Sequence, residues 1–137
     1  MQQTRGYRDL VAWRKGVEMV KETYRLISRL PKAEMFELSS QMRKAAVSVP
    51  ANIAEGQARR TAGEFLYHLG VARGSLAELD TLLEVGVEVG YFPSELALPI
   101  AERFIELRKI LQGLIDAIDR QSSTSTSRPA RTLSKPA

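Results

Sequence analysis

The single histidine of the chain offers the strongest sign of possible catalysis. Glu64 and His68 are four residues apart, so on a helix their side chains share a face and could contact one metal ion. A protein metal centre usually has about three or four protein ligands, and this pair supplies only part of such a set. The chain has no cysteine, which excludes thiolate ligands, cysteine nucleophiles and disulfides. We therefore predict no metal site and no cofactor.

Other kinds of catalytic site have even less support. A serine nucleophile needs a neighbouring base, and His68 is the one histidine that could serve. Gly70 and Gly74 are too sparse, and too deep within a helical pattern, to form a phosphate-binding loop. The sequence therefore predicts a protein that is not an enzyme.

Basic side chains gather in the first part of the chain. Residues 1–60 carry 12 Lys and Arg against 6 Asp and Glu, whereas residues 61–120 carry 5 against 10. Such a polarity suits the phosphate backbone of RNA or DNA, but it suits equally well two halves that attract each other within a bundle or across an interface. The nine residues that we expect to contact nucleic acid are Arg8, Arg14, Lys15, Lys21, Arg25, Arg43, Lys44, Arg59 and Arg60.

An acidic row lies in the second half of the chain. Asp80, Glu84 and Glu88 are spaced four residues apart and share one helix face, where like charges are mildly destabilising. A basic neighbour would relieve this repulsion. It could be the first helix of the same chain or the first helix of another subunit.

Four amphipathic segments position these charges. Each has apolar residues at steps of three and four, the pattern of a helix with one buried face. We expect helices over residues 9–30, with Asp9 as the cap, 36–56, 61–89, with Thr61 and Glu64 as a capping box, and from about 94 to 118. Four long helices with short connections predict an all-α, antiparallel, up-down-up-down four-helix bundle.

Three residues within these segments disturb the helical pattern. Pro50 lacks the N–H that would bond to the Ala46 carbonyl and clashes with that turn, so we predict a kink in the second helix. Gly70 and Gly74 each cost a helix about 0.5–1 kcal/mol relative to alanine. They predict the close approach of another helix backbone.

Composition divides the chain into one domain and two short flanks. We expect an N-terminal arm over residues 1–8, the bundle over 9–120, and a disordered Ser/Thr-rich tail over 121–137. No apolar run is long enough for a membrane span, so we predict no membrane contact, and with no cysteine we expect a cytoplasmic location.

A polar stripe accompanies Pro50. Ser48, Asn52, Glu55 and Arg59 follow at steps of four, three and four, opposite the apolar face. In one interpretation Ser48 and Asn52 satisfy backbone groups that Pro50 leaves free. In the other, the stripe is a contact surface for a ligand or partner.

The same segment carries a resemblance to a known family. The chain from Tyr7 to Leu114 resembles the bacterial proteins encoded within intervening sequences of large-subunit rRNA. The matching pieces are Leu10–Trp13, Leu30-Pro31 with Glu34, Gln41–Gly56, Glu64-Phe65, Ala72–Ser75 with Glu78-Leu79, and Gly90-Tyr91. The family motif includes Ser48, Pro50, Asn52, Glu55 and Gly56, and one departure is Phe36-Glu37 in place of the usual Tyr-Gly.

This resemblance implies a four-helix bundle, often a pentamer, with no enzymatic activity established for the group. Relatives of the same shape assist reverse transcriptases in diversity-generating retroelements, where a basic surface contacts nucleic acid. The resemblance and the charge pattern together predict a homo-oligomeric scaffold, with a pentamer favoured, that binds RNA or DNA and could have a reverse transcriptase or another protein as partner. The alternative is a protein-protein interaction module without a nucleic-acid role.

Overall fold

Four long helices form nearly all of the structure. The computed structural model describes residues 6–32 and 35–125. A short 3-10 turn, η1 (Gly6–Asp9), precedes α1 (Val11–Ile27), α2 (Met35–Gln57), α3 (Ala62–Glu88) and α4 (Ser94–Ser125). These residues include no strand. The prediction of an all-α four-helix protein is confirmed.

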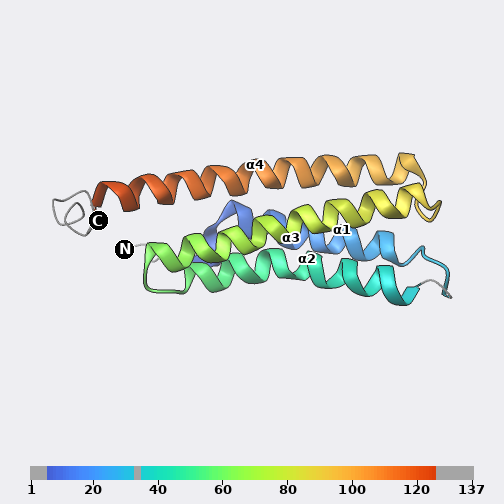
Figure 1. Cartoon of the computed structure of the whole chain (residues 1–137), viewed down its shortest axis with the longest axis horizontal. Helices are drawn as coiled ribbons and strands as arrows, with labels where there is room; N and C mark the ends of the chain where they lie inside the picture. Colours follow the sequence, from blue (N-terminus) through green and yellow to red (C-terminus); the bar gives the residue numbers. More distant parts are fainter. Residues whose placement is uncertain (1–5, 33–34, 126–137) are drawn as a thin grey trace, which may run out of the picture.

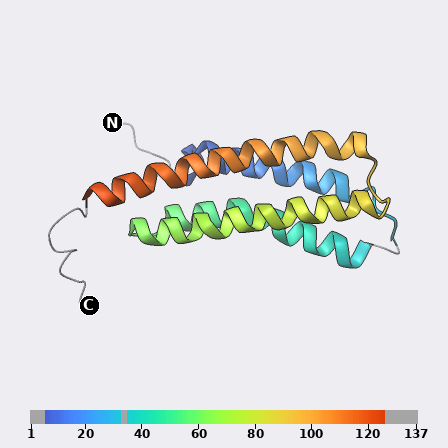
Figure 2. The same cartoon turned by 45° about the horizontal axis from the view of Figure 1, so that its top comes forward.

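The helices lie side by side, and successive helices run in opposite directions (Figure 1). In the turned view α4 covers α1, and α3 lies beside α2 (Figure 2). Within the described residues α1 contacts α2 and α4 but not α3, and α3 contacts α2 and α4. The four helices therefore occupy the corners of a square, with α1 and α3 diagonally opposite each other.

The predicted apolar seams meet along the axis of this square. Met19 and Leu26 of α1 are buried with Met42 of α2, Leu69 of α3 and Leu107 of α4. Burial of each such side chain stabilises the fold by about 1.5–3 kcal/mol relative to exposure. No buried side-chain nitrogen or oxygen in the described part of the chain lacks a hydrogen-bond partner.

The start of α1 differs from the prediction. Leu10, not Asp9, is the cap residue, and its side chain makes no capping hydrogen bond. Asp9 instead ends η1, where the Tyr7 and Trp13 rings pack with centroids 5.2 Å apart. Aromatic packing therefore fixes the entry to α1, and the prediction of Asp9 as the cap was wrong. The predicted cap of α3 is confirmed, because the Thr61 hydroxyl accepts a hydrogen bond from the Glu64 backbone N–H at 3.1 Å.

The ends of the bundle also depart from the expected domain limits. Residues 6–8 belong to η1, and residues 1–5 of the expected arm lie outside the described residues. At the other end α4 continues to Ser125, five residues into the expected disordered tail. Helical hydrogen bonds are local, so a helix can continue for a turn beyond its last packed residue. Residues 126–137 of the tail lie outside the described residues.

The proline within α2 and the two glycines within α3 were predicted to bend a helix and to admit another helix backbone, respectively. α2 continues through Pro50, which is buried, and a Cβ on Gly16 of α1 would lie 3.3 Å from the Pro50 Cβ. The kink itself stays a prediction. The expected helix approach at Gly70 and Gly74 was wrong within the chain, because a Cβ at either position would meet nothing within 4 Å. Both glycines lie away from the helices that pack on α3.

Candidate nucleic-acid interface

A groove of about 530 Å³ between α1 and α2 combines basic, hydroxyl and aromatic side chains. Arg43 and Lys44 come from α2, and Tyr24 comes from α1. The tyrosine side chain is 43% exposed, so its ring is open to a stacking partner. The groove is completed by Ser40, Val47 and Ser48.

The two cations of this groove have no carboxylate partner among the described residues. Arg43 donates to the hydroxyl of buried Ser39, which orients the guanidinium and leaves its other N–H groups available. Lys44 is exposed beside it on the same helix. An arginine and a lysine without a carboxylate partner can bind phosphate oxygens, the arginine in a two-pronged geometry.

A second group of predicted cations lies at the other end of the bundle. Arg8 lies over the Trp13 ring at 5.2 Å from its centroid, and Arg14 donates to the Arg8 carbonyl at 2.9 Å. Arg60 is exposed in the α2–α3 connection and makes no ion pair within the described chain. These three residues are therefore separate from the α1–α2 groove.

Three of the nine predicted cations are already paired. Lys15 contacts Glu106 of α4 at 3.1 Å, and Lys21 contacts Glu18 at 3.3 Å. Arg59 contacts Glu55 at 2.6 Å. These pairs are on the surface and add little to the stability of the fold, but they lower the positive potential around α1 and at the end of α2.

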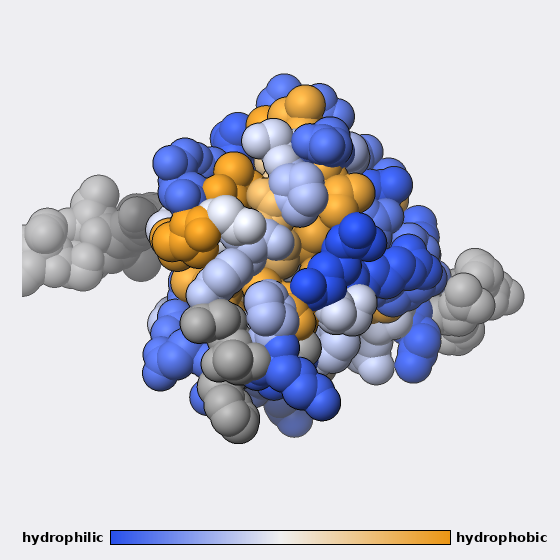
Figure 3. All heavy atoms as spheres, turned by 90° about the vertical axis from the view of Figure 1, so that its right-hand side faces the viewer, coloured by the Kyte–Doolittle hydropathy of each residue, from blue (hydrophilic) through white to orange (hydrophobic). Residues whose placement is uncertain are grey.

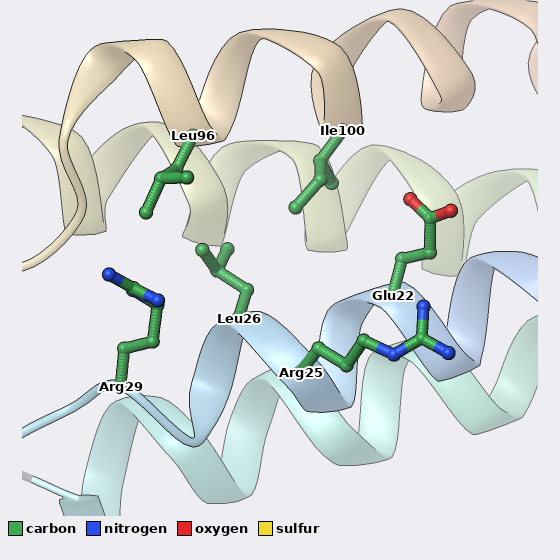
Figure 4. Close-up of a pocket in the computed structure, with 6 residues that line it drawn as sticks. All are labelled: Glu22, Arg25, Leu26, Arg29, Leu96 and Ile100. Atoms are coloured by element: carbon green, nitrogen blue, oxygen red, sulfur yellow. The ribbon is translucent and has the colours of Figure 1, made fainter.

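The ninth predicted cation, Arg25, lies on a different face. With Arg29 it borders a groove between α1 and α4 (Figure 4). The structure therefore does not join the nine residues into one continuous basic surface. It places two cations that have no ion pair among the described residues in the α1–α2 groove, and it distributes the others over the ends and the α4 side.

The family motif lies beside this groove and fixes α2 against α3. The hydroxyls of Ser48 and Ser75 are 2.7 Å apart, and the Asn52 side-chain amide donates to the Ser48 carbonyl at 2.9 Å. The other end of the Asn52 amide faces His68, with Oδ1 and Nδ1 3.0 Å apart. Since the Asn52 oxygen can only accept, this pattern assigns the proton to Nδ1 of His68.

This network concerns the first interpretation of the polar stripe. Ser48 and Asn52 bond to α3 and to each other, and in the described residues neither side chain bonds to the Ala46 carbonyl that Pro50 leaves free. The contact surface of the second interpretation stays a prediction. Glu55 lies outside the network, where the hydrogen bond from Arg59 holds the pKa of its carboxyl below the usual value.

Close packing of α3 against Gly56 explains why the motif ends in glycine. A Cβ there would lie 2.8 Å from the His68 Cβ, closer than real Cβ atoms approach, and 3.0 Å from Cδ1 of Phe65, which is also a tight contact. On the α1 side, Gly16 has no Cβ, and this lets α1 approach Pro50 closely. The motif therefore lets α2 approach both neighbours closely and presents Arg43 and Lys44 on a rigid support.

The sequence reasoning missed several members of these sites. Tyr24 follows Val20 and precedes Ile27 at the helical spacing of buried residues, a pattern that indicates burial, whereas the structure exposes it. Ser40 and Val47 lie one helical turn before Lys44 and Pro50 and could have been found from that spacing alone. Ser75, which belongs to another helix, gave no such signal.

The described residues offer neither a cluster of metal ligands nor a membrane-spanning helix. They contain no group of three or more His, Asp or Glu side chains able to hold a metal ion. No helix in the described part of the chain has both the length and the apolar content needed to cross a bilayer. The expected cytoplasmic location stays a prediction.

Comparisons with known proteins agree with this architecture. Residues 8–113 match the family model described as 23S rRNA-intervening sequence protein. The chain is also similar to a crystal structure of a protein of unknown function from the S23 ribosomal protein family of Bacteroides thetaiotaomicron VPI-5482. That likeness has 24% sequence identity and a TM-score of 0.73 over 77% of this chain and 96% of the other, and it shows a shared fold. No match is found among curated proteins.

Proposed function

This chain belongs to the 23S rRNA-intervening sequence protein family, and from that premise we propose a non-enzymatic scaffold that binds the backbone of RNA or DNA. We further propose that several copies assemble into a homo-oligomer, with five as the favoured number. The nucleic acid binds in the α1–α2 groove. The observation that carries the proposal is that Arg43 and Lys44 make no ion pair with a described residue and lie in one groove with the exposed Tyr24.

The chemistry of this groove suits a single strand better than a duplex. Arg43 and Lys44 contact phosphates, and the hydroxyl of Ser40 supplies a further donor. Tyr24 offers a ring on which any base can stack, an interaction of about 1–3 kcal/mol that tolerates all sequences. Repetition of the groove around a homo-oligomer adds the potentials of the copies and strengthens binding.

The test is the binding of a fluorescently labelled, random-sequence single-stranded RNA, and of its DNA equivalent, followed by anisotropy. We expect wild-type affinity to fall about tenfold or more between about 50 and 200 mM salt, because bound phosphates release counterions. The double variant Arg43→Glu and Lys44→Glu should lose most of this binding. Tyr24→Ala should weaken it by about tenfold.

Arg108→Glu with Lys109→Glu is the matched control, since it makes the same change in net charge on exposed residues of α4. Equal losses in the two double variants would mean that overall charge, and not the groove, attracts the strand. Wild-type protein that binds neither strand at low salt would contradict the nucleic-acid role and favour the alternative of a protein-protein interaction module. A reverse transcriptase partner stays a prediction from the resemblance.

A further inference from the structure

The acidic row of α3 faces outward beside an exposed leucine of α4. Asp80, Glu84 and Glu88 line a groove of about 340 Å³ between α3 and α4, and Leu98 lines the same groove. The Leu98 side chain is 61% exposed, although it is large and apolar. Glu95 and Glu102 lie three and four residues from Leu98 on α4, so acidic residues surround it. We call Asp80, Glu84, Glu88 and Leu98 the acidic edge.

No cation of the described chain neutralises this acidic edge. The described ion pairs involve other carboxylates, and Arg108, which lines the adjoining cavity with Asp80, makes no ion pair with it. The basic helix α1 is diagonally opposite α3 and does not contact it. Of the two neighbours that could relieve the row, the first helix of the same chain is therefore excluded.

A groove of opposite charge lies on the other side of α4. Leu96 and Ile100 of α4 point toward Leu26 of α1 and form its apolar floor, while Arg25 and Arg29 border it (Figure 4). We call these five residues the basic groove, whose volume is about 300 Å³. Glu22 also lines it, but its carboxylate is paired with Arg103 at 3.2 Å. Arg25 and Arg29 make no ion pair with any carboxylate of the described residues.

The two surfaces lie at the same level of the bundle. Leu96 and Ile100 line the basic groove, and Leu98, between them in the sequence, lies on the acidic edge. Both surfaces are close to the end at which α3 turns into α4, and that end of the molecule exposes apolar residues among hydrophilic ones (Figure 3). One copy therefore presents complementary surfaces on two adjacent sides of the first turns of α4.

We infer that the acidic edge of one copy docks in the basic groove of a second copy. Leu98 enters the apolar floor against Leu26, while Arg25 and Arg29 pair with the glutamates of the edge. The inference rests on the homo-oligomer proposed above and names the surfaces that form it. Docking brings opposite charges together and removes an exposed leucine from water, two effects that favour the same register.

The position of the two surfaces also constrains the assembly. Each copy uses two different surfaces, so the contact is head-to-tail and closes into a ring when its rotation divides a full turn. The two contact surfaces are on adjacent sides of a square bundle, so the directions in which they face differ by about a right angle. Because they lie at the same level, each copy is shifted little along the bundle axis relative to the next. A closed ring of about four or five copies follows. In this arrangement Arg25 contributes to assembly and not to nucleic-acid binding.

Charge exchange tests the contact, with the molar mass measured by light scattering and sedimentation in the absence of nucleic acid. We expect Arg25→Glu with Arg29→Glu, and separately Glu84→Lys with Glu88→Lys, to weaken self-association about a hundredfold. All four changes in one chain restore opposite charges across the contact and should restore the wild-type assembly. Arg43→Glu with Lys44→Glu matches the change of net charge in the Arg25 and Arg29 variant and should assemble normally.

Leu98→Ala tests the apolar part of the contact without any change of charge, and it should weaken self-association about tenfold. Ile105→Ala, at another exposed aliphatic residue of α4, is its control. An assembled wild type whose mass survives these changes, or a four-residue exchange that restores nothing, would overturn this contact and leave the proposed function intact. A monomeric wild type would overturn both the contact and the homo-oligomer, whereas the nucleic-acid assay would still decide the binding role.

Discussion

Two polar stripes of similar helical spacing have opposite surroundings in this molecule. The stripe of α2 contains Ser48 and Asn52, whose hydrogen bonds are satisfied by Ser75 and His68 of α3. The acidic row of α3 makes no ion pair with a cation of the described chain, and Glu84 lies against another carboxylate, that of Glu88. The same spacing thus produces a hydrogen-bonded contact between helices where another helix covers the stripe. Where no helix covers it, the result is a row of carboxylates without ion pairs in the described chain.

The closest packing in the seam provides the largest test of this comparison. A Gly56→Ala change places a Cβ within 3.2 Å of the Phe65 carbonyl oxygen as well as against His68, so α2 and α3 must move apart. We expect the free energy of unfolding to fall by about 2 kcal/mol, measured by urea denaturation. An unchanged midpoint would show that α2 and α3 are not held this closely.

Loss of the amide that joins the seam should have a smaller effect. Asn52→Ala removes the bonds to Ser48 and leaves the Nδ1–H of His68 without its acceptor, at a cost of about 1 kcal/mol or more if water does not replace it. A double-mutant cycle with His68→Ala measures the coupling directly. Additive losses in that cycle would contradict the direct bond between the two side chains.

The uncovered side of α3 should respond in the opposite direction. At Gly74 a new Cβ meets nothing within 4 Å, so Gly74→Ala adds helix preference without a clash. We expect a stabilisation of about 0.5–1 kcal/mol in dilute protein, in the same urea assay as for Gly56→Ala. Destabilisation would mean that another chain packs closely against this position.

The smallest expected effect is a difference in pH dependence between the two stripes. The hydrogen bond with Glu88, burial and the charges of Glu88 and Asp80 raise the pKa of Glu84 above 4.5, so folding favours its protonated form. Its contribution to stability is present below 4.5 and is lost as the pH rises through the raised pKa. Arg59 lowers the pKa of Glu55, whose contribution is present above 4.5 and is lost as the pH falls through the lowered pKa.

Melting temperatures of Glu84→Gln and Glu55→Gln, measured from about pH 3 to pH 7, separate the two cases. Relative to wild type, Glu84→Gln should gain stability as the pH rises above 4.5, and Glu55→Gln should lose it over the acidic range up to that value. Parallel curves for the two variants would show that their surroundings do not differ in this way.

Much of the fold could be predicted because its signals are local. Apolar steps of three and four located all four helices, and the Thr61 cap was recognised from one hydroxyl and one glutamate three residues later. The errors also have local causes. Asp9 has the right residue type for a cap, but the packing of Tyr7 on Trp13 gives the chain another entry to α1.

The candidate site was predicted less well because its members come from different helices. Periodicity identifies which residues of one helix share a face, but Tyr24 matched the buried seam and is exposed at the edge of the α1–α2 groove. Likewise the charge pattern identified nine cations without showing that Lys15 and Lys21 are paired, or that Arg25 faces α4. The ion-pair partner of a cation and the exposure of a side chain both depend on the neighbouring helix.

The sequence by itself determined four amphipathic helices, the separation of basic and acidic segments, and the absence of cysteine chemistry, because each depends on residue type and spacing within one segment. Only the tertiary structure decided that α1 and α3 are diagonal, which leaves the acidic row of α3 without the basic helix that could have neutralised it. The physical reason is that charge attraction falls with distance, and the distance between two helices is set by how all four pack.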